Sequence, residues 1–338
     1  MEEQEKVFRK LASIVRVDKI EPIDGADFIV LATVKGWKVV VKKDEYKEGD
    51  FAIYCEIDSF LPIRDEYSFL ERSYKKLVDG SEGYRLKTAK LRGVYSQGLL
   101  LPISLLVDMD VTDFMGITKY EASIPAQLSG TARGSFPSFI RKTDEERIQN
   151  LTKFTPKYRT LNFYITEKLD GTSFTAYNHD GVFGVCSRNL DLKETGGNTY
   201  WEVARTLDLE NKMNEIYPER SLAIQGEIIG EGIQGNKYHL MGSKLFAFNI
   251  YDIKEGRYVT KEEFESMCDV LGIDKVPVID KEATFPESID AALLFAEGKS
   301  ALNQKTEREG LVWVADTSGG ERVSFKTISN KFLAKNED

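Results

Sequence analysis

The sequence has 338 residues, of which 41% are hydrophobic, and this size predicts two globular domains with apolar cores. A formal net charge of −9 argues against polyanion binding through the overall field, so any nucleic-acid site must be a local patch. Three cysteines without a CxxC pair and only two histidines argue against a disulfide framework, a zinc site and a histidine-based triad, and they indicate a reducing compartment.

The N-terminus is charged and lacks an apolar segment, so we expect no signal peptide. No apolar run approaches the length that spans a membrane. These features predict a cytoplasmic protein that has no membrane partner.

Residues 1–122 are predicted to form a small all-β barrel. Short alternating runs are broken by closely spaced turn signals, among them Asp24-Gly25, Lys35-Gly36 and Glu48-Gly49-Asp50. The region resembles the OB-like, tRNA-binding-type modules of some tRNA-handling proteins. Its later part carries five basic residues: Lys76, Arg85, Lys87, Lys90 and Arg92. A basic strand and loop on such a barrel can hold a phosphate backbone, but a solvated barrel face is an equally good interpretation.

Residues 123–160 are predicted to form a linker and the first helix of the next domain. The composition shifts to Ser, Gly and Pro over residues 117–139. Residues 142–151 are charged and contain neither Gly nor Pro, which favours a helix there.

Residues 161–338 are predicted to form an α+β domain with mostly antiparallel strands. Strand patterns occur at residues 161–168, 181–189, 221–230 and 244–253, and the last two are apolar enough to indicate burial. Helices are expected at residues 198–217, with Asn198 as N-cap, and at 260–273, where Thr260 and Glu263 form a capping-box pattern. A hairpin is expected over residues 309–329, with its turn at Ser318-Gly319-Gly320. The domain lacks GxGxxG and the P-loop pattern, which argues against a Rossmann or P-loop nucleotide site.

The run "YITEKLDGTSF" places Lys168 at the end of a predicted strand, between Glu167 and Asp170. A lysine attacks phosphorus only when it is deprotonated, and its ordinary pKa is about 10.4. A nucleophilic lysine therefore needs nearby cations or desolvation, whereas the two carboxylates favour the charged amine. Lys168 is either part of a solvated salt-bridge turn or a nucleophile whose activating charge comes from elsewhere in the chain.

Six elements recur here in the order found in a known superfamily: KxDG at Lys168, Ser187-Arg188-Asn189, Glu227, the strand with Phe248 and Tyr251, Glu309-Gly310 and Lys326. This order resembles the covalent lysyl-nucleotidyltransferases, which comprise DNA ligases, RNA ligases and mRNA capping enzymes. The run "GEIIGEGIQGN" is similar to one in nick-sealing RNA ligases. The barrel-like region lies in front of the motifs, as in ATP-dependent RNA ligases with an N-terminal OB domain.

The resemblance implies an α+β nucleotidyltransferase domain of the ATP-grasp-like ligase type, preceded by a small all-β OB-like barrel. It also implies an ATP-dependent RNA ligase of RNA repair that joins 3′-OH and 5′-phosphate ends in a nicked duplex, acting as a monomer. The alternatives are a DNA ligase, a capping-type nucleotidyltransferase, or a non-catalytic RNA-binding protein with a degenerate transferase domain.

The resemblance also implies roles for the polar residues. Lys168 would attack the ATP α-phosphorus and form lysyl-AMP, and Lys326 would neutralise the α-phosphate and help Lys168 to lose its proton. Glu309 would hold the waters of Mg²⁺ or Mn²⁺, while Glu227 would bind a ribose hydroxyl or help the metal. Arg188 would contact the ribose, the phosphates or the RNA end.

The base would be held by a second group of residues. Tyr251 aligns with the aromatic residue that stacks on adenine, with Phe248 as its fallback, and Val312 aligns with the apolar residue on the opposite face. Glu167 would accept a hydrogen bond from the adenine amino group. Asp170 would orient the turn after Lys168. For all of these residues, ordinary strand packing or ion pairing is the alternative.

Two positions depart from the pattern of the nick-sealing ligases. Ile328 stands where a second lysine is expected after Lys326, and Val314 is apolar where a lysine is also expected. Either Lys331 or a residue from elsewhere replaces them, or triphosphate binding is weaker.

Overall fold

The computed structural model describes residues 10–102, 110–119, 130–151, 159–317 and 322–336. Two compact units divide the chain: the first comprises mainly the residues up to 123, and the second comprises residues 124–148 and 154–332. None of the helices in the described segments is long and apolar enough to cross a membrane.

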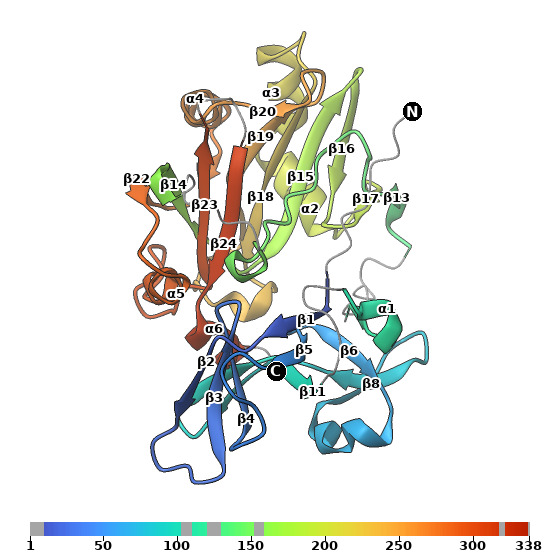
Figure 1. The fold of residues 1–338 in the computed structure, drawn as a ribbon. Helices are drawn as coiled ribbons and strands as arrows, with labels where there is room; N and C mark the ends of the chain where they lie inside the picture. Colours follow the sequence, from blue (N-terminus) through green and yellow to red (C-terminus); the bar gives the residue numbers. More distant parts are fainter. Residues whose placement is uncertain (1–9, 103–109, 120–129, 152–158, 318–321, 337–338) are drawn as a thin grey trace. The chain divides into compact units, whose positions relative to one another are not determined.

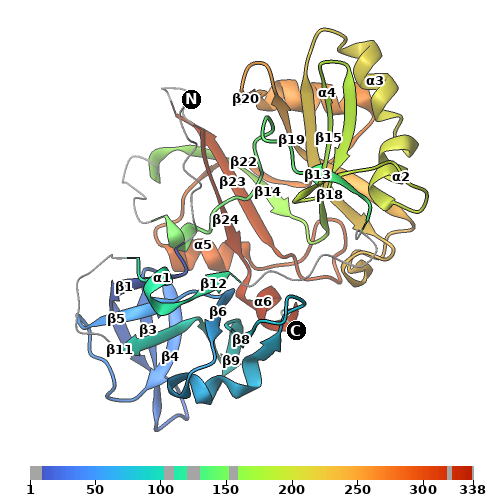
Figure 2. The ribbon, with the colours of Figure 1, turned by 90° about the vertical axis from the view of Figure 1, so that its right-hand side faces the viewer.

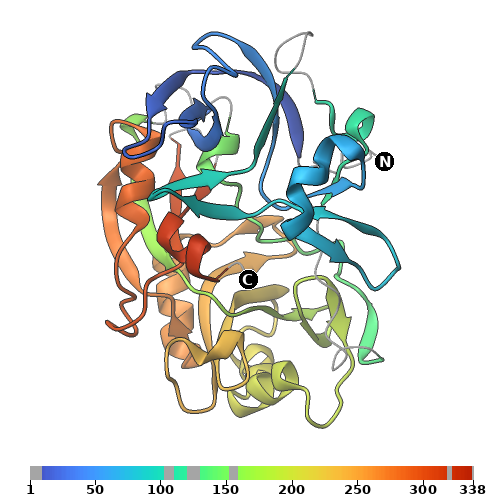
Figure 3. The ribbon, with the colours of Figure 1, turned by 90° about the horizontal axis from the view of Figure 1, so that it is seen from below.

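Short antiparallel strands form the first unit, and they are strongly curved in Figures 1 and 3. One sheet has the order β1 (Ala12–Arg16), β5 (Phe51–Cys55) and β11 (Leu99–Pro102), and another has the order β2 (Lys19–Pro22), β3 (Ile29–Val34) and β4 (Trp37–Lys42). A third contains β12 (Thr118–Lys119), β6 (Ser59–Pro62), β8 (Glu82–Arg85) and β7 (Tyr74–Lys76), and β9 (Thr88–Leu91) pairs with β10 (Val94–Gln97). A 3₁₀ helix (Asp65–Ser73) and α1 (Thr112–Met115) complete the unit. The prediction of an all-β OB-like domain is confirmed.

The local chemistry of the first unit follows its sequence pattern. Alternate residues of β3 and β4 are buried, as expected for strands with one face on a core. The turn between them, Lys35-Gly36, has positive φ angles of 49° and 82°, which suits a tight two-residue hairpin. Among the basic residues, Lys76 pairs with Glu82 at 2.7 Å and Arg85 with Asp58 at 3.3 Å, so part of the positive set is already neutralised within the unit.

The second unit contains a large antiparallel sheet that is covered on one face by helices (Figure 2). Its strands, in spatial order, are β13 (Ala132–Ser135), β17 (Leu190–Leu192), β16 (Val182–Cys186), β15 (Thr172–His179), β18 (Leu222–Gly230), β19 (Ser243–Asp252) and β20 (Arg257–Tyr258), and β21 (Asp274–Lys275) pairs with β19. The covering helices are α2 (Thr199–Thr206), α3 (Leu209–Ile216) and α4 (Lys261–Leu271). Ile224 and Ile250 of the sheet pack against Trp201 and Phe264 of the helices in one buried cluster.

A second, four-stranded sheet completes this unit. It contains β22 (Val278–Thr284), β14 (Asn162–Lys168), β23 (Gly310–Asp316) and β24 (Arg322–Ile328) in that order. In the chain, α5 (Ile289–Ala296) lies between β22 and β23, and α6 (Asn330–Asn336) follows β24. Phe163, Trp313 and Phe325 form an aromatic core on one face of the sheet, with ring centroids 5.4–5.8 Å apart. The predicted hairpin is confirmed as β23 and β24, although its turn, Ser318-Gly319-Gly320, lies outside the described residues.

The predicted helix at residues 142–151 is wrong. Only Ile148–Asn150 form a 3₁₀ turn, because the preceding backbone pairs with an edge strand instead of with itself. The amide of Lys326 donates to the carbonyl of Glu146 at 2.8 Å, and Arg147 bridges Lys326 in parallel. The exposed edge of β24 offered partners that composition alone does not reveal.

The other helix predictions are confirmed with one change. Asn198 caps α2 by accepting from the amide of Tyr200 at 3.0 Å, and Thr260 caps α4 by accepting from that of Glu263 at 3.2 Å. The helix expected over residues 198–217 is broken at Asp208, whose φ of 53° cannot continue an α-helix. The sequence pattern did not indicate α5.

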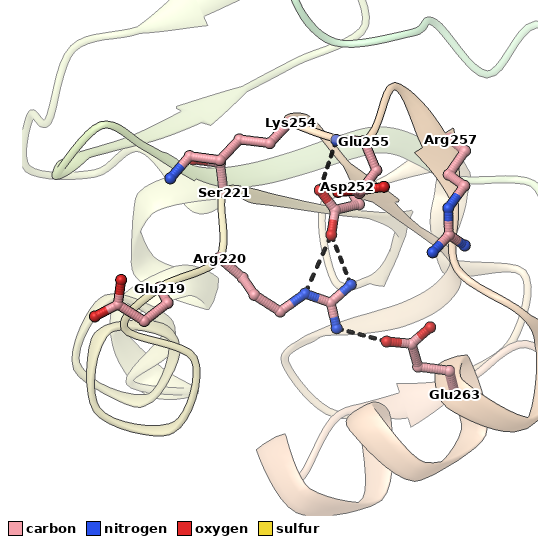
Figure 4. Close-up of a pocket in the computed structure, with 8 residues that line it drawn as sticks. All are labelled: Glu219, Arg220, Ser221, Asp252, Lys254, Glu255, Arg257 and Glu263. Carbon is pink, nitrogen blue, oxygen red and sulfur yellow. Dashed lines mark hydrogen bonds and ion pairs between the residues drawn. The ribbon is translucent and has the colours of Figure 1, made fainter.

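Arg220, which lies just before β18 in the chain, forms ion pairs with residues of β19 and α4 (Figure 4). Its guanidinium donates to Asp252 Oδ2 from Nε at 3.1 Å and from Nη2 at 2.7 Å, and its Nη1 donates to Glu263. The Asp252 side chain is only 6% exposed. Burial opposes its ionisation, but hydrogen bonds from Arg220 and from the amide of Glu255 lower the pKa of Asp252.

We expect Arg220→Met to lower the free energy of unfolding by about 1–3 kcal/mol at neutral pH, because it leaves a buried carboxylate without its cation. Since the folded-state pKa of Asp252 is lowered, this stabilisation is present above its ordinary value of 3.8 and is lost as the pH falls through the folded-state value. Urea unfolding at neutral and acidic pH measures the loss of unfolding free energy and its pH dependence. Lys254→Met is the control, since Lys254 lines the same depression without a hydrogen bond or ion pair among the described residues. Equal losses in the two variants would contradict the assignment.

Candidate active site

Lys168 and Glu309 form an ion pair at the junction of two neighbouring strands. Lys168 ends β14 opposite Gly310, the first residue of β23, so that Glu309 directly precedes the strand beside Lys168. The Lys168 Nζ lies 2.8 Å from the Glu309 carboxylate, although the residues are 141 positions apart in the sequence. The exposed fractions are 28% for the Lys168 side chain and 15% for Glu309. Strand pairing therefore brings together the first and fifth of the six motif elements.

Glu227 adds a second carboxylate from the large sheet. It lies on β18, and its Oε1 accepts from the amide of Gly171 at 3.1 Å, directly behind the turn that follows Lys168. Burial, together with the Glu309 carboxylate, raises the pKa of Glu227 to about 7, while the Lys168 ammonium acts in the opposite direction. Glu227 and Glu309 thus flank the lysine from two different sheets.

The pKa of Lys168 reflects this acidic surrounding. Burial lowers the pKa of the amine, but the carboxylates of Glu309, Glu227 and Asp170 together outweigh burial and raise it above the ordinary value. The lysine is therefore stored as an ammonium, as the local sequence suggested.

Lys326 lies on β24, which pairs with β23, and its pKa has the opposite shift to that of Lys168. Thr166, Val312 and Lys326 are aligned across β14, β23 and β24, two residues along the strands from the row that contains Lys168. Burial, reinforced by the cations of Lys168 and Arg147, lowers the pKa of Lys326 to about 8. The structure thus brings Lys168, Glu309, Glu227 and Lys326 into one electrostatically coupled group.

Three motif glycines permit the close backbone contacts that this group requires. An ideal Cβ would lie 2.2 Å from the Thr327 carbonyl oxygen at Gly310, 2.3 Å from that of Ile228 at Gly171, and 2.6 Å from that of Phe246 at Gly226. Any larger residue would push neighbouring strands apart beside a functional side chain.

The expected base-binding residues are divided between two clusters. Phe248 packs, together with Leu302, against a buried cluster that contains Leu169, the residue after Lys168. Glu167 is 1% exposed, and its Oε2 accepts from the amide of Ala301 at 2.8 Å, next to Leu302. Val312 is half-buried in the row of Lys326.

Tyr251 lies in a different cluster. It packs with Ile140, Tyr177 and Ala223, and its ring meets that of Tyr258 edge-on at 5.2 Å. A register shift in the pairing of β18 with β19 separates it from Phe248, because Gln225 pairs with Asn249 while Gly226 pairs with Ala247. Phe248 is thus the extra residue of a β-bulge.

Arg188 and Lys331 pair with carboxylates of other segments. Arg188 is exposed and binds Asp144 at 2.6 Å, and Lys331 binds Glu297, the residue after α5, at 2.7 Å. The apolar side chains of Ile328 and Val314 are buried, as their sequence implies.

The donor set suits a hydrated divalent cation. The described residues contain no group of three or more His, Cys, Asp or Glu side chains that could enclose a metal. Mg²⁺ in nucleotide sites is usually held by one or two carboxylates, by waters and by phosphate oxygens. Glu309 and Glu227, which both interact with the Lys168 ammonium, fit this pattern.

The sequence analysis missed two residues of this region. Lys237 forms an ion pair with Asp170, and the segment of Arg147, predicted to be helical, runs along β24 beside Lys326. The side chain of Arg147 is buried. Lys237 follows directly after the "GEIIGEGIQGN" run, which is the one sequence signal that marks its loop.

Comparisons with known proteins match most of the chain. Residues 161–328 match the sequence model described as RNA ligase, and residues 11–103 match one for an OB-fold domain. No curated protein sequence matches the chain.

Several solved structures are similar to it. A mutant of the Naegleria gruberi RNA ligase with AMP and Mn is 41% identical, with a TM-score of 0.88, and the match covers 97% of this chain and 99% of that one. The same ligase with PPi is 42% identical, with a TM-score of 0.87 and coverage of 98% and 100%. Another mutant with ATP and Mn is 41% identical, with a TM-score of 0.87 and the same coverage.

We expect Gly310→Ala to destabilise the protein by about 1–3 kcal/mol, because the added methyl group overlaps the backbone of β24. Thermal unfolding measures the loss. Gly196→Ala is the matched control, since a Cβ there meets no atom within 4 Å and the residue has no positive φ. A thermal midpoint equal to that of the control would show that β24 can move to accept the methyl group without loss of stability.

Proposed function

Because the chain belongs to the RNA ligase family, whose members form phosphodiester bonds, we propose that it seals RNA nicks through a covalent lysyl-AMP, with ATP and a divalent metal. The observation that carries this proposal is the position of Lys168, which pairs with Glu309, interacts with the Glu227 carboxylate and lies two rows from Lys326 in the same sheet. The reported contents of the related Naegleria structures, ATP or AMP with Mn, support the choice of nucleotide and metal.

The first step joins AMP to the enzyme. The deprotonated Lys168 amine attacks the α-phosphorus of ATP, an N–P bond forms, and the bond to the pyrophosphate oxygen breaks. Lys326 lies two rows from Lys168 in the same sheet and would neutralise the charge that spreads over the α-phosphate oxygens. Glu309 and Glu227 would hold a Mg²⁺ or Mn²⁺. Its positive charge would take the place of the Lys168 ammonium as the partner of these two carboxylates.

Two further transfers complete the reaction. The RNA 5′-phosphate attacks the AMP phosphorus and releases Lys168, which leaves a phosphoanhydride between AMP and the RNA. The 3′-OH then attacks the RNA phosphate, a phosphodiester bond forms, and AMP leaves. The role of the protein in both steps is to align attacking and leaving oxygens and to stabilise phosphate charge. Arg188, exposed on the surface, is proposed to contact the RNA end.

We assign adenine stacking to Phe248 instead of Tyr251. Phe248 packs against the cluster of Leu169 and beside Leu302, whereas Tyr251 belongs to the cluster of Tyr177. Glu167, next to Ala301, would accept a hydrogen bond from the adenine amino group, which favours ATP over GTP. Val312 would contact the other face of the base.

The covalent step is tested with α-labelled ATP or GTP and with Mg²⁺ or Mn²⁺. After denaturation, the wild-type protein should retain label from ATP, and Lys168→Ala should abolish it because the nucleophile is removed. The control is Lys254→Met, which lies on the surface depression of Figure 4 and should be labelled normally. Label from GTP alone would contradict the adenine assignment, and no label from either nucleotide would favour a non-catalytic RNA-binding protein. Sealing is then compared on nicked duplexes with ribose or deoxyribose at the 3′-OH end, since equal sealing would indicate a DNA ligase.

The base pocket is tested by the ATP concentration that gives half-maximal labelling. Phe248→Ala should raise it about tenfold, since base–aromatic stacking contributes about 1–3 kcal/mol, and Phe248→Tyr should restore it. Tyr251→Leu should instead lower the thermal midpoint and leave the ATP requirement unchanged. The opposite pattern would return the stacking role to Tyr251.

A further inference from the structure

The turn that follows Lys168 is held by side chains of the loop between β18 and β19. The Lys237 ammonium pairs with the Asp170 carboxylate, and the Tyr238 hydroxyl accepts from the Asp170 amide at 2.7 Å. The exposed fractions are 25% for the Lys237 side chain and 17% for Asp170. Both contacts fix the backbone two residues beyond the nucleophile.

The loop contains three residues in left-handed conformations and is closed by local hydrogen bonds. Gln234, Asn236 and His239 all adopt positive φ angles, of 46°, 48° and 55°. The Asn236 side chain closes the loop, since its Nδ2 donates to the Leu240 carbonyl at 2.9 Å and its Oδ1 accepts from the Leu240 amide at 3.0 Å. Such a cluster of left-handed residues costs free energy and persists where a fixed geometry is useful.

The backbone of Lys237 contacts the other half of the site. Its carbonyl oxygen accepts from Thr306 Oγ1 at 2.6 Å and from Asn303 Nδ2 at 3.5 Å. These residues belong to the segment that leads directly to Glu309. One residue therefore contacts the chain just after Lys168 through its side chain and the chain just before Glu309 through its carbonyl.

The Lys237 ammonium is also restrained by an aromatic ring. It lies 4.7 Å from the centroid of Phe332, within the range of a cation–π contact. The ring and the Asp170 carboxylate leave this long side chain little freedom. The position of Lys237 can therefore fix the position of Asp170.

We propose that Lys237 is a positioning residue that sets the geometry of Lys168 relative to Glu309. This inference rests on the proposed transfer of AMP to Lys168. Lys237 does not touch the reacting atoms; it joins the two segments that carry them, which come from distant parts of the sequence.

The test is single-turnover transfer of labelled AMP to the full-length protein, together with the ATP requirement and the thermal midpoint. Lys237→Met should slow transfer at saturating ATP by about 10–100-fold, as expected for a small misplacement of the reacting groups. The ATP concentration for half-maximal rate should change by less than about threefold, because the change does not touch the nucleotide. Lys237→Arg, which can still pair with Asp170, should recover most of the rate.

Coupling separates positioning from a general structural role. In the Asp170→Asn background, Lys237→Met should slow transfer little further, since the shared contact is already weakened. Thr306→Val removes only the contact to the Lys237 carbonyl, keeps the shape of the side chain and should slow transfer in the same direction. It also keeps the proposal testable if Lys237→Met does not fold. Lys275→Met, which breaks a surface ion pair with Asp269, is the control that should leave transfer unchanged.

The outcomes distinguish this inference from the proposed function. If the wild-type protein takes up no label, the proposed function fails and the inference falls with it. If the wild-type protein is labelled but Lys237→Met and Thr306→Val react at the wild-type rate, only the inference is overturned. Effects of Lys237→Met and Asp170→Asn that simply multiply would also overturn it.

Discussion

The site depends on one interaction, the ion pair of Lys168 with Glu309 in the presence of Glu227. Two carboxylates, Glu309 beside β23 and Glu227 on β18, hold the lysine as an ammonium, so the proposed nucleophile is held in its unreactive form. Lys326, two rows away, is partly buried near the cations of Lys168 and Arg147, and its pKa has the opposite shift. Two lysines on the same small sheet thus have opposite pKa shifts because of their neighbours, and in the proposed reaction substrate and metal would reverse the balance at Lys168.

Strand pairing and close backbone contacts bring these side chains together. Lys168 and Glu309 meet because β14 and β23 pair in a register that places Lys168 opposite Gly310. Glu227 joins them because the turn at Gly171 lies against β18, where there is no space for a Cβ. The motif glycines therefore set how closely the strands approach, and the motif acids and lysines use the positions that result.

Much of this was predictable from the sequence. Strand patterns and helix caps identified most elements of the second unit, because alternation and capping are local. The order of KxDG, Glu227, Glu309 and Lys326 led to the family. The helix at residues 142–151 failed because an edge strand supplied the hydrogen-bond partners, and the link from Lys237 to Asp170 was missed because an isolated loop lysine carries no local signal. Such long-range pairings are set by the assembled sheets.

The bulge at Phe248 changes which face of the sheet each residue of β19 points to. In a regular strand, residues five positions apart point to opposite faces. Because one extra residue is inserted, Phe246 pairs with Glu227 and Tyr251 with Ala223, so both point away from the covering helices. A sequence alignment shows only how many residues precede Asp252 in the strand. It does not show that the bulge changes which face of the sheet each side chain points to. Among relatives, an insertion or deletion of one residue in this strand would change which aromatic side chain points away from the covering helices, while every motif stayed intact.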